Sequence, residues 1–329
     1  MDNTLVIRTP EDAVAAVPYL LGFHPEDSLV AVGSDGPNGT CAMRADLLPH
    51  RAVEAAERVA GLLADNGFRQ ALLIGYGPAE RVEPVLMAVW DELAERHIKV
   101  GEALRVERGR WWSYHCEDPL CCGPDGTPYD ITTTAVAAQA TVAGQVVLAD
   151  RASLAATVAP LGGESMRLAT RRAEARVFDR IHSAERLIEE GLPFVQDVIG
   201  RRDRLTDDEV ALLGIYLGHI RVRDEAWVRT RPDRHLELWR DVLRRVDERY
   251  AAAPACLLAY TAFVSGDGGL ANLALDRADA AMPGYSMAEL LRDLIVSGIP
   301  PRQAVLKMSP EDLAEAWDAE HPRRLPKAG

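Results

Sequence analysis

The sequence lacks several features that would place it at once in a known functional class. Its 329 residues contain no uninterrupted apolar run near the roughly 20 residues that a membrane-spanning helix needs. They also contain no P-loop, no His-Glu-x-x-His motif and no Gly-x-Ser-x-Gly turn. We therefore expect no membrane association, and none of these three catalytic signatures is there to assign a reaction.

Positive charge is also scarce. The sequence has 37 lysine and arginine residues against 50 aspartate and glutamate residues, a formal net charge of −13. Because binding to a nucleic-acid phosphate backbone requires a local excess of cationic side chains, nucleic acid is not an expected partner. The arginine-rich stretches 167–186 and 221–249 are interleaved with acidic residues at helical spacing, which favours solvated, ion-paired helix faces.

The N-terminal residues predict the compartment. They lack both the basic region and the apolar stretch of a signal peptide. We therefore expect a cytoplasmic protein in a reducing environment, where permanent disulfides are rare.

Residues 1–155 alternate between strand and helix patterns. The pairs Asp35-Gly36 and Asn38-Gly39 separate two apolar segments and predict an antiparallel hairpin. Helices between the later strands act as crossovers, which implies parallel neighbours. We therefore predict an α/β domain with a mixed sheet covered by helices. The predicted strands are 5–7, 28–33, 40–47, 71–76, 103–114 and 145–148, and the predicted helices are 10–21, 51–66, 79–96 and 131–143.

Residues 156–329 form a second, all-α domain in this interpretation. Thr206 and Ser309, each followed by acidic residues, are helix start signals. Residues 259–283 resemble one tetratricopeptide-type helix pair, which would either pack as ordinary core or line a peptide-binding groove. The predicted helices are 164–190, 206–218, 231–251, 254–265, 268–281, 286–297 and 310–319.

The segment from Trp111 to Gly126, here called the aromatic-cysteine loop, is the most specific part of the sequence. Strand alternation places Trp111 and Trp112 on opposite faces, so at least one tryptophan faces the core and the other could line a pocket. Three of the five cysteines lie in this loop. Its candidate ligand-binding residues are Trp111, Trp112 and Tyr114, and its candidate metal or redox residues are His115, Cys116, Cys121 and Cys122.

Several hypotheses fit the thiols of the aromatic-cysteine loop. With a histidine, Cys116, Cys121 and Cys122 could supply four zinc ligands, but adjacent cysteines and a gap of four fit a zinc knuckle poorly. A small-loop disulfide, a nucleophilic thiol and a redox sensor are the other chemical readings. Plain burial of one or two sulfurs is the strongest of the alternatives.

Three further residues are candidates for a ligand site. Arg44 and Asp46 share one face of their strand, so they form either an edge ion pair in water or part of a polar site. His24 lies in the short link before the strand at 28–33, where it is either a surface residue or a ligand contact. Gly75-Tyr76-Gly77 could present backbone N–H groups to an anion.

Four segments carry a family resemblance. They are residues 21–30, the sequence Arg44-Ala45-Asp46-Leu47, the aromatic-cysteine loop and the block from Gly266 to Ser286. Together they resemble the actinobacterial family called domain of unknown function 4192 over nearly the whole chain. The resemblance implies a cytoplasmic actinobacterial protein, and it implies no catalytic residues.

Two functions remain open. The first is a non-enzymatic interaction or regulatory protein, in which the α/β domain responds to a ligand or redox state and the helical domain binds a protein partner. The second is an enzyme that uses a thiol or a bound metal in a pocket between the Arg44/Asp46 strand and the loop from Trp112 to Cys122. Replacing the three loop cysteines one at a time would distinguish these two functions.

Overall fold

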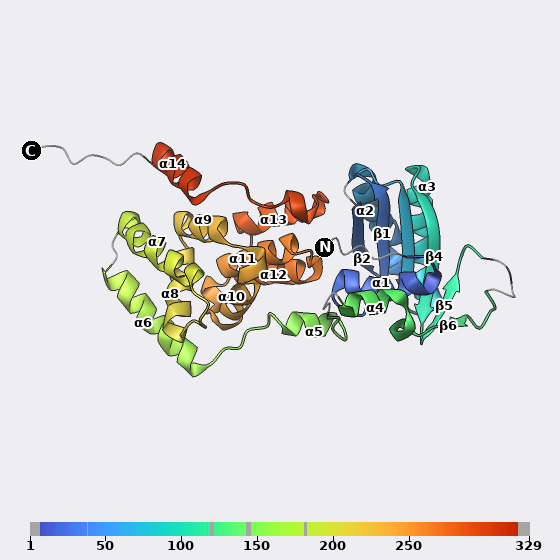
Figure 1. The fold of residues 1–329 in the computed structure, drawn as a ribbon, viewed down its shortest axis with the longest axis horizontal. Coiled ribbons are helices and arrows are strands. Elements are labelled where there is room, and N and C mark those ends of the chain that lie inside the picture. The colour runs from blue at the N-terminus through green and yellow to red at the C-terminus, as the bar shows by residue number, and fades with distance from the viewer. Residues whose placement is uncertain are drawn as a thin grey trace, which may run out of the picture. The chain divides into compact units, whose positions relative to one another are not determined.

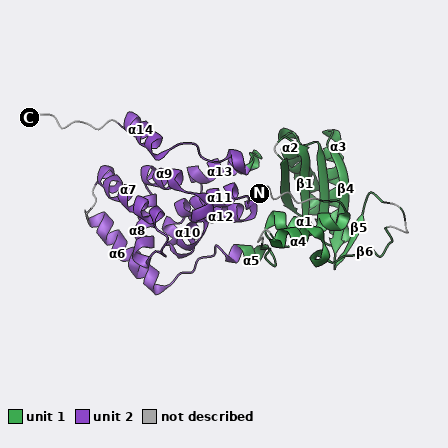
Figure 2. Cartoon of the chain, viewed as in Figure 1, with its two compact units in different colours: residues 1–154, 296–300 green, residues 155–295, 301–329 purple. Residues whose placement is uncertain are grey.

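The computed structural model describes residues 7–37, 39–116, 118, 122–142, 146–180 and 183–321. The chain divides into two compact units, shown in different colours in Figure 2. The α/β unit contains residues 1–154 and 296–300, and the helical unit contains residues 155–295 and 301–329. In the part of the chain that the structure describes, we find no helix with the length and apolar character to cross a membrane.

Six strands of the described residues form one mixed sheet in the order β2-β1-β3-β4-β5-β6. β3 and β4 run parallel, and the other neighbouring pairs run antiparallel. The predicted α/β domain with a mixed sheet is therefore confirmed, including the antiparallel hairpin of β1 and β2. The strands are β1 Ser28–Gly36, β2 Gly39–Asp46, β3 Gln70–Tyr76, β4 Lys99–Glu107, β5 Arg110–Ser113 and β6 Thr127–Pro128.

Helices cover both faces of this sheet (Figure 1). α2 (Ala52–Asp65) and α3 (Ala79–Glu95) pack on one face, where their apolar residues join Leu29, Leu73 and Ala103 of the strands in one buried cluster. α3 is the crossover that lets β3 and β4 run parallel. α1 (Pro10–Leu21) contacts β2 and β4 on the other face, and α4 (Ala135–Val142) packs against α1.

The predicted strand at 103–114 is wrong in one respect, because the structure has a hairpin there. β4 ends at Glu107 and β5 starts at Arg110, so Arg108 and Gly109 form the two-residue turn with φ angles of 49° and 72°. Two successive positive φ angles match the twist of an antiparallel pair, and Gly109 adopts its angle without steric cost.

Two other predicted strands fall only partly within the described residues. Of the strand predicted at 145–148, residue 145 lies outside the described residues, Leu148 makes an isolated bridge to Phe23, and Val146 and Val147 are outside any strand. Of the first predicted strand, residues 5 and 6 lie outside the described residues, and Ile7 is irregular.

The helical unit confirms the predicted mostly helical C-terminal region. The predicted helix 164–190 is two helices, α6 and α7, and α9 was missed. Every residue of α11 from Ala252 to Phe263 is buried, which makes it the central helix, with α12 joined to it by a short turn. α5 Arg151–Ala156 spans the boundary between the two units. The helices that follow are α6 Glu164–Arg180, α7 Ala184–Gly200, α8 Asp207–Leu217, α9 Ile220–Arg229, α10 Pro232–Arg245, α11 Ala252–Val264, α12 Gly268–Ala281, α13 Ser286–Val296 and α14 Pro310–Glu320.

The helix α9, which was not predicted, also corrects the expectation for the charged residues 221–249. The charges of residues 221–249 predicted a solvated face, yet Arg221, Arg223 and Glu225 of α9 are all buried. The spacing did find a true pair, because Arg221 and Glu225 are four residues apart and 2.8 Å from each other. Buried charges persist where they are paired and hydrogen-bonded, and the sequence does not show which ion-paired face other helices cover.

Candidate functional site

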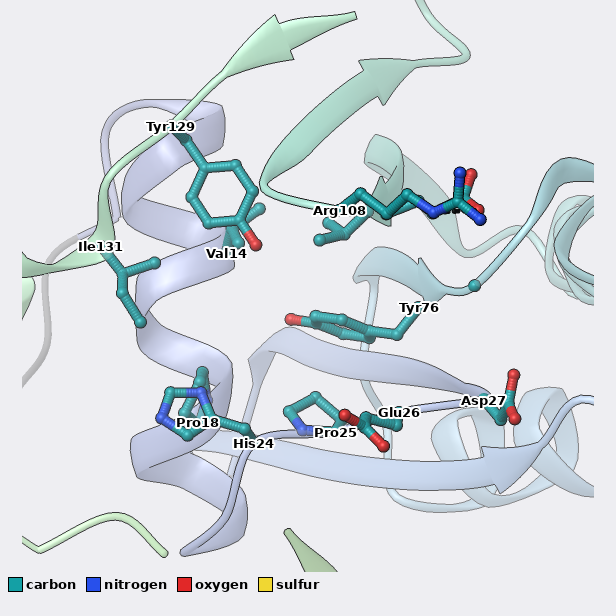
Figure 3. Close-up of a pocket in the computed structure, with 13 residues that line it drawn as sticks. Val14, Pro18, His24, Pro25, Glu26, Asp27, Tyr76, Arg108, Tyr129 and Ile131 are labelled. Carbon is teal, nitrogen blue, oxygen red and sulfur yellow. Dashed lines mark ion pairs between the residues drawn. The ribbon is translucent and has the colours of Figure 1, made fainter. Parts of the chain in front are cut away.

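A cavity of about 380 Å³ opens beside the carboxyl ends of β3 and β4. Open α/β sheets bind ligands at this edge, and the volume is within the usual range for a small molecule. The walls come from α1, the link before β1, the ends of β3 and β4, and the segment after β6 (Figure 3). The lining residues are Val14, Pro18, His24, Pro25, Glu26, Asp27, Tyr76, Gly77, Val106, Glu107, Arg108, Tyr129 and Ile131.

Tyr76 is the last residue of β3. Its neighbour Gly75 faces Val82 of α3, so alternation along the strand directs Tyr76 to the other face, where α1 lies. Tyr76 is 8% exposed, and its hydroxyl has no hydrogen-bond partner among the described residues. Burial, with a smaller contribution from Tyr129, raises the pKa of Tyr76 well above its usual value. Tyr76 therefore presents a neutral hydroxyl to which no described residue is hydrogen-bonded.

Tyr129 supplies a second hydroxyl. Its backbone N–H donates to the carbonyl oxygen of Gly109, which holds the segment after β6 against the β4–β5 turn. Partial burial raises the pKa of Tyr129. Figure 3 shows the hydroxyls of Tyr76 and Tyr129 directed into the same space. Two neutral phenols thus face one part of the cavity.

The cavity has an apolar end and a charged end (Figure 3). Val14, Pro18 and Ile131 line the end into which the two hydroxyls are directed, while Arg108 and Asp27 lie away from them.

Two carboxylates of the lining already have arginine partners. The carboxylate of Asp27 accepts a hydrogen bond from Arg81 at 2.7 Å, and that of Glu107 accepts one from Arg105 at 2.7 Å. Their charges are therefore largely compensated.

Ser28 lies next to Tyr76 in the register of β1 and β3. It is fully buried, and its hydroxyl also has no hydrogen-bond partner among the described residues. Native proteins satisfy most buried polar groups, so two adjacent unsatisfied hydroxyls at one sheet edge are unusual.

The structure does not bring together the predicted pocket between the Arg44/Asp46 strand and the aromatic-cysteine loop. Arg44 and Asp46 form a 2.8 Å ion pair on β2, at one edge of the sheet. Trp112 is on β5, and β1, β3 and β4 lie between the two strands. His24, by contrast, does line the cavity.

The aromatic residues of the loop pack onto the fold. Trp111 is buried, as alternation requires of one tryptophan. Trp112 lies 3.6 Å from the Arg105 guanidinium and donates from Nε1 to the carbonyl oxygen of Pro124. The Tyr114 hydroxyl donates to Glu83, and burial together with this carboxylate raises the Tyr114 pKa. The His115 ring contacts Trp90.

The zinc hypothesis stays a prediction. Cys116 and Cys122 are partly buried, while Cys121 lies outside the described residues. Within the described ranges, no three His, Cys, Asp or Glu side chains are grouped closely enough to hold a metal ion.

Replacing Gly126 by alanine tests how the loop is held. Gly126 has a φ of 69°, and a Cβ there would lie 2.4 Å from the Trp112 ring. We expect Gly126→Ala to lower the free energy of unfolding by about 1–3 kcal/mol, measured by urea unfolding. Gly109→Ala is the matched control, because Gly109 has a similar φ of 72° with no atom within 4 Å of its Cβ position. An equal loss in both variants would show that the Trp112 contact adds nothing.

The burial of each cysteine predicts how readily its thiol reacts. Burial raises the pKa of Cys256 in α11 to about 12, so almost no thiolate is present near neutral pH. We expect iodoacetamide to leave Cys256 unmodified in the native protein and to modify it in urea, as read by peptide mass mapping. Cys41, which is partly exposed, is the comparison, and modification of Cys256 at the rate of Cys41 would contradict this assignment.

Apart from His24, the residues that line the apolar end were not singled out as ligand contacts from the sequence. The motif Gly75-Tyr76-Gly77 did mark the place, but for backbone N–H groups, and the Gly77 N–H instead donates to the carbonyl oxygen of Val106 at 3.0 Å. The available signal was a tyrosine ending an apolar strand just before a crossover helix. Nothing local marked Tyr129.

Fold and cavity together define a two-unit protein, in which an α/β unit with a mixed sheet contains an open, ligand-sized pocket and a helical unit follows. The chain belongs to the family described as domain of unknown function (DUF4192), whose sequence model matches residues 10–302. No curated protein and no solved structure matches it.

Proposed function

We propose that the protein is a non-enzymatic, ligand-responsive interaction protein. The α/β unit binds a small molecule between Tyr76 and Tyr129, and the helical unit binds a protein partner. The observation that carries the ligand half is the Tyr76 hydroxyl, which is buried, faces a ligand-sized cavity and has no partner among the described residues.

Energetics favour ligands that accept a hydrogen bond from this hydroxyl. A bound ligand that buries the hydroxyl without accepting its hydrogen bond incurs a cost of about 1–3 kcal/mol, which an accepting ligand avoids. The raised pKa values of Tyr76 and Tyr129 keep both phenols protonated near neutral pH, which suits hydrogen-bond donation. The two protonated phenols therefore favour non-covalent binding over covalent chemistry.

The partner half of the proposal rests on the helical unit. α11 and α12 form the pair that we interpret as tetratricopeptide-like. Since α11 is buried, the outward face of α12 is the part of this pair that a partner would contact. A cytoplasmic location, a role for the loop thiols and bound zinc belong to the same proposal as predictions.

A thermal-shift screen of small metabolites with the full chain tests the ligand half. We expect at least one compound to raise the melting temperature of the wild type and to leave Tyr76→Phe unchanged. Tyr114→Phe is the matched control, because its hydroxyl already bonds to Glu83 outside the cavity lining, and it should respond like the wild type. A screen in which every active compound shifts Tyr76→Phe equally, or in which none is active, would refute the pocket as the site.

A further inference from the structure

We infer that the group entering the apolar end of the cavity is a neutral carbonyl oxygen of an amide or lactam, rather than a carboxylate, a phosphate or an ammonium group. This inference rests on the proposed function, because it names the chemical class of ligand that the same pocket takes. Three features of the pocket carry it: the two phenols, the charges and the imidazole of His24.

The first feature is the pair of donors. The Tyr76 hydroxyl has no partner among the described residues, so Tyr129 does not satisfy it, and both hydroxyls are directed into one space (Figure 3). Raised pKa values keep a proton on each oxygen. A carbonyl oxygen has two lone pairs and accepts from two donors, whereas an ammonium group has only donors and leaves both phenol protons unsatisfied.

The second feature is the absence of compensating charge. The cavity is lined at this end by the apolar side chains of Val14, Pro18 and Ile131, and the nearby carboxylate of Glu26, below Tyr76 in Figure 3, is an anion and not a cation. An ionised carboxylate or phosphate would lose its hydration here without gaining a cation. Arg108 is 89% exposed at the other end, next to Glu107, and Arg81 is bonded to Asp27. A neutral acceptor avoids this desolvation cost.

The third feature is His24. Its partly buried imidazole lies beside Pro18 at the same end of the cavity (Figure 3). An imidazole nitrogen that carries no proton accepts a hydrogen bond. Such a nitrogen can accept from the N–H that stands next to the carbonyl in an amide or lactam, which a ketone or an ester lacks. The side chains of Tyr76, Tyr129 and His24 thus match the donor and acceptor pattern of an amide.

The inference is tested with three probes of one shape and different charge: benzamide, benzoate and benzylammonium. Dissociation constants for the full-length chain are measured by ligand-observed nuclear magnetic resonance near neutral pH. We expect benzamide to bind at least tenfold more tightly than either charged probe. Tyr76→Phe and, independently, Tyr129→Phe should each weaken benzamide binding at least tenfold, and Tyr114→Phe should leave it unchanged.

The outcomes separate this inference from the proposed function. If benzoate or benzylammonium binds more tightly than benzamide and loses affinity in Tyr76→Phe, the neutral class is wrong and the pocket function stands. If no probe shows binding that depends on Tyr76, the amide class is refuted, and the metabolite screen above then decides the pocket function on its own.

Discussion

Tyr76→Phe is expected to stabilise the ligand-free protein while it weakens ligand binding. The substitution keeps the aromatic ring and removes a buried hydroxyl that has no hydrogen bond among the described residues. Removing that desolvation cost should raise the free energy of unfolding by about 1 kcal/mol. In a domain of this size, this corresponds to a rise in melting temperature of about 2–4 °C, measured by calorimetry of the full chain. Opposite changes in stability and binding are typical of a side chain retained for function.

Tyr114→Phe makes the same chemical change at a satisfied hydroxyl. Tyr114 donates to Glu83 at 3.3 Å, so its loss should lower or leave unchanged the free energy of unfolding. A lower melting temperature in Tyr76→Phe than in Tyr114→Phe would mean that the Tyr76 hydroxyl supports the fold, and the functional argument from its missing partner would fail.

Glu225→Ala is expected to cause the largest loss of stability among these substitutions, about 3–5 kcal/mol. Glu225 on α9 is 2% exposed and accepts hydrogen bonds from Arg221 at 2.8 Å, Arg229 at 2.6 Å and Gln196 at 2.9 Å. Without the carboxylate, the buried guanidinium of Arg221 loses the anion that lies 2.8 Å from it. Urea unfolding followed by far-ultraviolet circular dichroism measures this loss.

Two further variants serve as comparisons for Glu225→Ala. Glu225→Gln keeps one acceptor oxygen and should lose less than Glu225→Ala. Glu237 on α10 is also ion-paired, to Arg240, but it is 75% exposed, so Glu237→Ala should change the stability little. Similar losses in Glu225→Ala and Glu237→Ala would show that burial of the α9 pair has no energetic consequence.

The same carboxylate predicts a pH dependence. Burial alone would raise the pKa of Glu225, but hydrogen bonds from Arg221, Arg229 and Gln196 outweigh burial and lower it. Because the folded-state pKa is below the unfolded-state value of about 4.3, this stabilisation is complete above that value and is lost as the pH falls through the folded-state pKa. Below about pH 4 the wild type should therefore lose stability more steeply than Glu225→Ala. Parallel pH profiles for the two proteins would contradict this.

Local signals in the sequence were enough to predict much of the architecture. Thr206 and Ser309 each cap a helix through a side-chain oxygen that accepts from a backbone N–H, as their positions predicted. The glycines between β1 and β2 predicted their antiparallel hairpin. These features depend on residues a few positions apart, so a sequence can show them directly.

Features that depend on burial were harder to predict. The arginine and glutamate residues of α9 have the pattern of a solvated helix, and only packing against other helices makes them a buried network. Arg108 and Gly109 also turn the chain where the apolar pattern continued, so one long strand was expected in place of β4 and β5.

The sequence alone determined the mixed α/β unit, the helical unit that follows and the family to which the chain belongs. Only the tertiary structure decided where the candidate site lies. Tyr76 and Tyr129 are far apart in the chain, and they face one cavity because β3 pairs with β4 while the β4–β5 turn holds the backbone of Tyr129. The same strand order separates Arg44 from Trp112 by three strands, because sheet topology is set by long-range pairing rather than by local sequence.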